Sequence, residues 1–466
     1  MNSRFPTALR PALLLALLLM LSLAGCQHIA PRAPISASTP ASDAAGVAPS
    51  TATIPDIKSW AFVDGGGLNW DPDWDTYFPQ LTVLGHKLYA AWREMTPDDG
   101  PMQVHVAVYN GNDQAPAWRF VDGNPSGGLN RNAKSDAFNI QIAAFDARLY
   151  AIWQEETSTG AHPIHVAVYN GNDAAPTWSA VAGPVGINHD PAARGAHPQL
   201  MVSDSKLYAI WMESNGATLQ IRAAVYNGND VAPGWRFVDG NGIHGLNKNV
   251  SENALHPRLT PFSDRLYATW VENHASGAQI RVAVYSGNDM TPTWNFVDGG
   301  QETGINRDPA RDAAYPALAV YNAKLYAAWT ESNGDANQVQ VAVYNGEDHA
   351  PAWTFVDGNG TGLNRYRENT AYTPQLTAFG SKLYATWYET DGGSDSSSQL
   401  RVALYNANDQ APAWSFVDGG GASGLNKDVR YSAFDPQLTV FQSKLYLTWK
   451  ELSDTGGHKI HVMVGQ

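Results

Sequence analysis

The sequence predicts an all-β protein whose main domain, residues 58–466, is a seven-bladed β-propeller of four-stranded blades closed by an N-terminal strand. Three observations predict this fold. One segment repeats seven times, each copy contains four short strand-like runs, and the first and last copies are incomplete in complementary ways. Nothing in the repeat has a helical period. A signal segment (residues 1–25) and a tether (residues 26–57) precede the domain.

Two tryptophan motifs define the repeat. Copies of Trp-x-Phe-Val-Asp-Gly, one of them diverged, follow one another at intervals of 57 to 61 residues. They begin at Trp60, Trp118, Trp178 (the diverged copy), Trp235, Trp294, Trp353 and Trp414. The second motif, Leu-Tyr-x-x-Trp-x-Glu, has its Trp at positions 92, 153, 211, 270, 329, 387 and 449. A repeat of this length buries its apolar face only against its neighbours, so the period indicates a repeat architecture.

Each copy contains four runs rich in Val, Tyr, Trp and Leu, separated by Gly, Asn, Asp and Pro. In the first copy these runs are residues 79–84, 87–94, 103–110 and 117–121. Their composition and partial alternation are typical of strands. The chain ends on a third-strand run and begins with an extra Trp strand, residues 60–63, so we expect this strand to complete the last blade. An open solenoid with two exposed edges is the alternative.

The composition excludes several classes of protein. Of the 466 residues, 44% are hydrophobic and 16% are charged, so the chain can bury a large core and is not disordered throughout. With 30 Lys and Arg against 44 Asp and Glu, the net charge is −14, and we expect no nucleic-acid partner. A single Cys allows no internal disulfide and no Cys-based zinc site. We predict no metal and no cofactor.

The N-terminus has the features of a secretory signal. A short basic start precedes an apolar run, residues 12–21, which is too short for a transmembrane helix. The run leads to Leu-Ala-Gly-Cys, ending at Cys26, the single Cys of the chain. This tetrapeptide resembles the lipobox of bacterial lipoproteins, and the resemblance implies that Cys26 is lipidated and becomes the first mature residue. In Gram-negative lipoproteins, a residue other than Asp at the next position, here Gln27, implies sorting to the outer membrane.

The alternative for Cys26 is a chance Cys after an ordinary signal peptide. Residues 27–57 are rich in Ala, Ser and Pro and have no apolar period, which is typical of a tether. We therefore expect the propeller to be held at a membrane by a lipid anchor, without a spanning segment.

The turn between the third and fourth runs carries an Asp followed five residues later by a Trp. The pairs are Asp113/Trp118, Asp173/Trp178, Asp230/Trp235, Asp289/Trp294, Asp348/Trp353 and Asp409/Trp414. This spacing resembles the Asp-box of sialidase-like propellers, although the Gly of that box is Ala or Thr here. Tyr109 and Trp118 also resemble Kelch blades, which carry a Gly-Gly pair that this chain lacks. The resemblance implies the architecture of residues 58–466 and carries no function.

A carboxylate recurs in every Trp-x-Glu motif. The seven residues are Glu94, Glu155, Glu213, Glu272, Glu331, Glu389 and Glu451. One interpretation is a ligand-binding ring of carboxylates suited to cations or sugar hydroxyls. The alternative, which we favour, is that each Glu accepts N–H groups from neighbouring loops. A Gly-x-Asn in each connection between blades, and the Asp of each hairpin, are expected to form turns through their own side chains.

One active site requires unlike groups in one place, so catalysis would need departures from the repeat. The first connection between blades, residues 70–75, departs most, because it contains Trp70 and Trp74, which lie outside both tryptophan series. Two Trp on a polar rim suit stacking on a sugar ring, and packing against an adjacent loop is the alternative. Alternate carboxylates in this loop resemble the start of a calcium loop, but the Gly and distal Glu of an EF-hand are missing.

Near-identical blades favour repeated surfaces over a single asymmetric site. The sequence therefore favours a lipid-anchored, extracytoplasmic binding propeller for a glycan or a protein partner, and an enzyme is the less favoured interpretation. The alternatives are a glycan-processing hydrolase or lyase of sialidase-like architecture and an envelope assembly scaffold. The sequence contains neither a nucleophile elbow nor a phosphate loop, but a site assembled across blades leaves little local signature.

Overall fold

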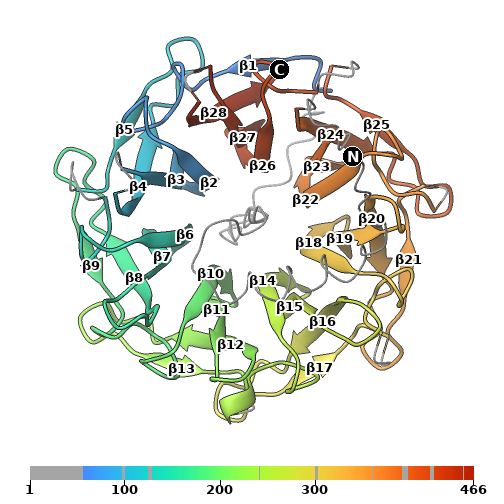
Figure 1. Cartoon of the computed structure of the whole chain (residues 1–466), viewed down its shortest axis with the longest axis horizontal. Helices are drawn as coiled ribbons and strands as arrows, with labels where there is room; N and C mark the ends of the chain where they lie inside the picture. Colours follow the sequence, from blue (N-terminus) through green and yellow to red (C-terminus); the bar gives the residue numbers. More distant parts are fainter. Residues whose placement is uncertain are drawn as a thin grey trace, which may run out of the picture. The chain divides into compact units, whose positions relative to one another are not determined.

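A computed structural model describes residues 56–466 of the chain, apart from 97–99, 124–127, 241, 300–302, 359, 391–396, 420–423 and 455. The described residues form seven antiparallel four-stranded sheets, arranged as the blades of a ring (Figure 1). The predicted seven-bladed propeller is therefore confirmed. The signal segment, Cys26 and the tether as far as residue 55 lie outside the described residues. In the described part, no helix combines the length and the apolar character needed to cross a membrane.

The four strands of each blade run from the axis of the ring outwards. The innermost strands are β2 (Thr76–Leu84), β6 (Ala137–Phe145), β10 (Gly195–Ser203), β14 (Ala254–Phe262), β18 (Ala313–Tyr321), β22 (Thr370–Phe379) and β26 (Ala433–Phe441). The second strands are β3 (Lys87–Met95), β7 (Arg148–Glu155), β11 (Lys206–Ser214), β15 (Arg265–Glu272), β19 (Lys324–Ser332), β23 (Lys382–Thr390) and β27 (Lys444–Leu452). We number blades 1 to 7 in this order.

The third strands are β4 (Met102–Tyr109), β8 (Ile164–Tyr169), β12 (Leu219–Tyr226), β16 (Gln279–Tyr285), β20 (Asn337–Tyr344), β24 (Gln399–Tyr405) and β28 (His458–Gly465). The outermost strands are β5 (Trp118–Phe120), β9 (Trp178–Ala180), β13 (Trp235–Phe237), β17 (Trp294–Phe296), β21 (Trp353–Phe355), β25 (Trp414–Phe416) and β1 (Trp60–Phe62). A 3-10 helix, η1 (Gly242–His244), lies in the connection after β13.

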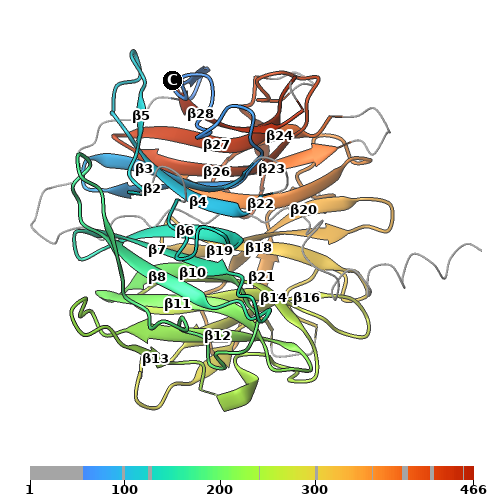
Figure 2. The ribbon, with the colours of Figure 1, turned by 60° about the vertical axis from the view of Figure 1, so that its left-hand side comes forward.

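The last blade is completed by the start of the domain. Strand β1 pairs antiparallel with β28, with Trp60 opposite Gly465 and Phe62 opposite Met463. The expected closure by the Trp60 strand is therefore confirmed, and the alternative of an open solenoid is excluded. Blades 1 and 7 lie side by side, with β2 next to β26 (Figure 2).

The hydrophobic cores lie between neighbouring blades. The Trp of each Trp-x-Glu motif is at most 3% exposed and packs against the adjoining sheet. The Trp of each outermost strand donates its indole N–H to a Val carbonyl of the preceding blade, as Trp118 does to Val63 at 2.8 Å. The two recurring Trp of the sequence thus join blade to blade.

Each blade has two ends with different connections. The loop face carries the connections between blades and the loops after the Trp-x-Glu strands, and the hairpin face carries the remaining turns. On the hairpin face, the Asp of each hairpin forms an ion pair with a Lys or Arg of the preceding blade. The pairs are Lys87–Asp173, Arg148–Asp230, Lys206–Asp289, Arg265–Asp348, Lys324–Asp409, Lys444–Asp113 and, through the segment before β1, Lys382–Asp56.

This corrects one expectation from the sequence. The Asx turn of the first hairpin is formed by Asn112, whose side chain accepts the N–H of Gln114 at 3.1 Å. The neighbouring Asp113 instead accepts hydrogen bonds from Tyr109 of its own blade and from Tyr446 of blade 7. The hairpin Asp therefore joins two blades.

Candidate functional site

The seven Glu of the Trp-x-Glu motifs lie on the loop face and are at most 4% exposed. Each accepts the indole N–H of the Trp two residues earlier and a backbone N–H of the preceding inter-blade loop, at 2.8–3.1 Å. Glu94, for example, also accepts the N–H of Asp71 at 2.9 Å. Burial raises the pKa of both Glu94 and Glu331. These contacts hold each loop against the blade that follows it.

The Asn of each Gly-x-Asn holds the same loop to the blade that precedes it. Asn130 accepts the N–H of Val104 at 3.0 Å and donates to the carbonyls of Met102 and Ser135 at 2.8 Å. Equivalent bonds join Asn247 to Ile221 and Asn426 to Leu400. The Glu and Asn series therefore act as a pair of clamps on each connection between blades.

The two Trp outside the tryptophan series lie at the first inter-blade loop. The Trp70 ring stacks on His105 with centroids 6.0 Å apart and meets Phe120 edge-on at 4.6 Å. Its indole, 36% exposed, thus packs against outer strands β4 and β5 of blade 1. Trp74 is half-buried, and its carbonyl accepts a hydrogen bond from Asn69 at 2.8 Å.

A different set of side chains departs from the repeat and converges near the axis. Every innermost strand has a β-bulge close to its start, and each bulge holds a non-glycine residue at a φ of 48–55°. These residues are Phe78, Asn139, His197, His256, Tyr315, Thr373 and Asp435. A left-handed φ is uncommon for such residues, and bulges commonly re-aim a side chain next to an active site.

The second strand contributes the residue between Trp and Glu. These residues are Arg93, Gln154, Met212, Val271, Thr330, Tyr388 and Lys450. Each is paired with the residue just before the bulge, as Arg93 is with Tyr77 and Lys450 is with Phe434. We call these seven residues and the seven bulge residues the axial ring. The residue between Trp and Glu differs in every blade, whereas that Trp and Glu do not change. The bulge residue also varies, with His repeated in blades 3 and 4 only.

Contacts between neighbouring blades link the axial ring on the side of blades 6, 7 and 1. The Tyr388 and Phe434 rings have centroids 5.2 Å apart, and Lys450 Nζ lies 5.2 Å from the Phe434 centroid. Lys450 also lies 4.5 Å from the Tyr77 centroid, and the Arg93 guanidinium lies 4.9 Å from the same ring. A continuous series of ring contacts therefore leads from Tyr388 of blade 6 through Lys450 of blade 7 to Arg93 of blade 1.

The contacts continue through the other blades. Gln154 accepts hydrogen bonds from Asn139 at 3.1 Å and from the backbone N–H of His197 at 3.0 Å. The His197 and His256 rings have centroids 4.8 Å apart, and Tyr315 stacks on His256 at 5.4 Å. The axial ring is thus an asymmetric set of aromatic, basic, acidic and imidazole groups.

Burial sets the protonation of this ring. It lowers the pKa of Lys450, and Asp435, 3.6 Å away, opposes that shift. Burial and the charge of Asp435 raise the pKa of Tyr315 and Tyr388. Near neutral pH the ring therefore contains two protonated phenols and a lysine that deprotonates more easily than an exposed one. This combination suits general acid–base chemistry.

Two carboxylates lie near Lys450, and each has a cationic or imidazole partner. Asp435 pairs with Lys450, and Asp75 lies 3.0 Å from His458 Nδ1. Hydrogen bonds from His458 lower the pKa of Asp75 despite its partial burial. A two-carboxylate glycosidase needs one carboxyl group with a raised pKa as its acid, and the environment of Asp75 has the opposite effect.

The sequence contained a signal for this site. The middle residue of Trp-x-Glu varies between two invariant neighbours, and the residue before Pro79, Pro198, Pro316, Pro374 and Pro436 varies as well. The site residues predicted from the sequence, which are the invariant Glu and the Trp of one loop, are not part of the axial ring. Repetition indicates what holds the blades together, whereas a single site depends on what differs between them.

The comparisons with known proteins bear on the fold. No family model matches the sequence. No curated protein matches it either. Among solved structures, the polysaccharide lyase Uly1 has a TM-score of 0.52 at 11% identity, covering 88% of this chain and 95% of that chain. An α-L-arabinofuranosidase of Fusarium graminearum has a TM-score of 0.41 at 12% identity, with coverages of 87% and 97%. At these identities the likeness shows the propeller fold alone.

Proposed function

We propose that the axial ring is the active site of a glycan-processing enzyme, a lyase that cleaves uronate-containing polysaccharide by elimination. The observation that carries the proposal is the run of Arg93, Lys450 and Tyr388 around shared aromatic rings. A glycan-processing enzyme is one of the alternatives that the sequence predicts, although the sequence favours a binding function.

Each of the three groups has a role in the proposed reaction. The Arg93 guanidinium binds the uronate carboxylate and neutralises its charge. Lys450, whose pKa is lowered by burial, acts in its neutral form as the base. Tyr388, whose pKa is raised by burial, keeps its proton and acts as the acid.

The reaction balances without an added reagent. Lys450 takes the proton from the carbon next to the carboxylate, and the electron pair of that C–H bond forms a carbon–carbon double bond. The bond to the glycosidic oxygen breaks, and Tyr388 donates its proton to that oxygen. Both groups return to their resting protonation by exchange with water. The polysaccharide lyase Uly1 is an example of elimination chemistry on this fold.

The proposal places the enzyme outside the cytoplasm on a lipid anchor. Its support is the lipobox-like sequence ending at Cys26, followed by Gln27 and the Ala/Ser/Pro-rich tether. A tether of about 30 residues lets a propeller reach polymer several nanometres from the bilayer. Anchoring keeps the enzyme at the membrane.

The experiment is a turnover assay of the full chain on a panel of uronate-containing and neutral polysaccharides. Elimination leaves an unsaturated uronate that absorbs ultraviolet light, whereas hydrolysis creates reducing ends without that absorbance. We expect ultraviolet-absorbing product from at least one uronate polymer. Lys450→Met and Tyr388→Phe should each lower kcat about 100-fold or more, the size of a general acid–base contribution.

Two matched variants control for indirect effects. Lys134→Met changes an exposed lysine, and Tyr321→Phe changes a tyrosine of the hairpin face; both should retain the parent rate. Reducing ends without ultraviolet absorbance would show hydrolysis and overturn the elimination mechanism. No turnover on the whole panel, together with glycan binding that the axial variants abolish, would favour the binding function instead.

A further inference from the structure

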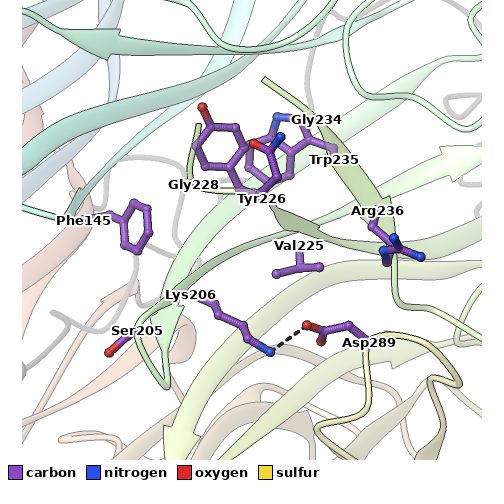
Figure 3. Close-up of a pocket in the computed structure, with 11 residues that line it drawn as sticks. Phe145, Ser205, Lys206, Val225, Tyr226, Gly228, Gly234, Trp235, Arg236 and Asp289 are labelled. Atoms are coloured by element: carbon purple, nitrogen blue, oxygen red, sulfur yellow. Dashed lines mark hydrogen bonds and ion pairs between the residues drawn. The ribbon is translucent and has the colours of Figure 1, made fainter. Parts of the chain in front are cut away.

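A pocket of about 630 Å³ lies on the hairpin face at blade 3, at the ends of the strands opposite the bulges. Figure 3 shows Phe145 on one side of this pocket, Arg236 on the other, and the ion pair between Lys206 and Asp289 along its edge. The ion pair is 2.6 Å long, and its side chains are 38% and 21% exposed. A ligand in the pocket can therefore reach both charged groups.

Equivalent pockets occur in the next two blades, with volumes of about 1090 Å³ at blade 4 and 270 Å³ at blade 5. Each has an ion pair across the boundary to the following blade. In blade order the pairs are Lys206–Asp289, Arg265–Asp348 and Lys324–Asp409. A phenylalanine from the end of an innermost strand lines each pocket: Phe145 at blade 3, and Phe262 at blades 4 and 5.

The polar groups of the pocket retain bonding capacity. The Lys206 ammonium has three donors, and Asp289 accepts one of them. The Asp289 carboxylate has about four lone-pair sites, and hydrogen bonds from Lys206 and Tyr285 occupy two. The pocket therefore offers both donors and acceptors next to an aromatic ring.

This chemistry selects a class of ligand. A sugar hydroxyl donates and accepts at once, so neighbouring hydroxyls match a Lys–Asp pair, and the C–H face of a sugar packs on an aromatic ring. The pair is neutral as a unit, which favours an uncharged sugar over an anionic one. The geometry points to a row of carbohydrate-binding sites on the hairpin face at blades 3, 4 and 5, each for one neutral sugar residue of a polymer.

One position distinguishes the three sites. The middle residue of the outermost strand lines each pocket and is Arg236 in blade 3, Asn295 in blade 4 and Thr354 in blade 5. The side chain at this position differs in length and in its number of hydrogen-bond donors, whereas an ion pair is present in all three pockets. This residue therefore sets which sugar each site prefers. Three sites on one face bind a polymer more tightly than a single sugar, because the second and third contacts are intramolecular.

The sites are independent of the proposed lyase reaction, which uses the opposite end of the blades. The experiment measures binding of the full chain to methyl glycosides of glucose, galactose and arabinose by saturation-transfer NMR, and to neutral galactan and arabinan by affinity electrophoresis. We expect weak binding of at least one methyl glycoside and binding of its polymer at least about tenfold tighter. Phe145→Ala with Phe262→Ala, which alters all three pockets, should lower the polymer affinity at least tenfold.

Arg236→Ala is the milder variant, since this arginine is exposed and lies outside the ion pair. It should change the sugar preference and lower polymer affinity about threefold, given one site of three. Arg367→Ala, at an exposed arginine of the loop face, is the matched control and should bind as the parent does. Equal binding by all these variants, or no neutral glycan bound, overturns the inference. Lys450→Met should leave this binding intact, which separates it from the lyase proposal.

Discussion

The Nδ1 atom of His105 lies 2.7 Å from the Asp122 carboxylate, and both side chains are buried. The same third-strand position pairs with the Asp of the Trp-x-Phe-Val-Asp-Gly motif in other blades, as His461 does with Asp64 at 2.6 Å. In blade 2 the motif is diverged, and Ala182 stands where the other copies have Asp. His165 therefore lacks that carboxylate, and its buried Nδ1 has no hydrogen-bond partner among the described residues.

We predict that Ala182→Asp raises the pKa of His165. Burial lowers this pKa to about 4 in the parent, and a carboxylate beside the imidazole favours the charged form. The expected rise is at least 2 pH units, measured by NMR titration of the imidazole. His105 and His461 serve as internal references, because each already has its Asp. An unchanged titration of His165 would show that the new carboxylate does not reach the ring.

We predict that the propeller loses stability as the pH falls from about 6.5 towards 4. Burial lowers the pKa of His162 and His165 to about 4, whereas an unfolded His titrates near 6.5. The unfolded state therefore binds more protons in this window, so the full stability is present above the unfolded pKa and declines below it. The decline is up to about 1.4 kcal/mol per pH unit for each histidine.

Urea unfolding at pH 7 and pH 5 measures this effect. Replacing both histidines with Asn should flatten the dependence between these pH values. The same slope in parent and variant would contradict the assignment to His162 and His165.

We predict that deleting residues 58–64 destabilises the whole domain. The deletion removes β1, its pairing with β28, and the hydrogen bond from Trp60 to the Val417 carbonyl at 3.1 Å. Because β1 is the outermost strand of the last blade, its loss exposes the edge of β28 and removes the Val63 carbonyl that Trp118 of blade 1 binds. Calorimetry should show one transition at a lower melting temperature. A melting curve identical to that of the parent would mean that closure does not contribute to stability.

We predict that Glu213→Gln lowers stability without affecting glycan turnover or binding. Glu213 accepts the indole N–H of Trp211 and the N–H groups of His189 and Asp190 at 2.8–3.0 Å. A neutral amide has one acceptor oxygen, so at least one buried donor loses its partner, at a cost of about 1–3 kcal/mol. Chemical denaturation measures the change. If the variant were as stable as the parent but no longer bound glycan, the result would instead support the seven Glu as a ligand-binding ring.

We predict that Cys26→Ala abolishes anchoring of the mature domain through a lipid. The change removes the sulfur to which the lipid is attached in lipoproteins, and an unlipidated chain lacks the buried acyl carbons that anchor it. Fractionation of cells should move the protein from the membrane to the soluble fraction or leave an unprocessed precursor. The lipid anchor would be excluded if the variant still bound the membrane and the mature parent protein carried no lipid.

Much of the fold followed from repetition. The spacing of Trp60, Trp118 and their successors predicted the number of blades, and the extra strand at residues 60–63 predicted how the ring closes. Local pattern was sufficient because each repeat buries the same residues against the same neighbours. The hairpin Asp was less predictable: its ion pair joins it to a residue more than 80 positions away, as with Lys87 and Asp173. No local spacing encodes that contact.

The amino-acid sequence alone determined the all-β class, the seven blades and the closing strand, because these depend on short-range alternation and on a period that repeats. The tertiary structure decided which residues meet. It placed the Trp-x-Glu carboxylates in buried clamps, and it brought Arg93, Lys450 and Tyr388 together from blades separated in the chain by up to about 360 residues. The bulge near the start of each innermost strand places a side chain that varies among the blades around one axis. The axis exists only because the ring closes. The contacts between blades 7 and 1 therefore arise from the fold and not from any neighbouring stretch of sequence.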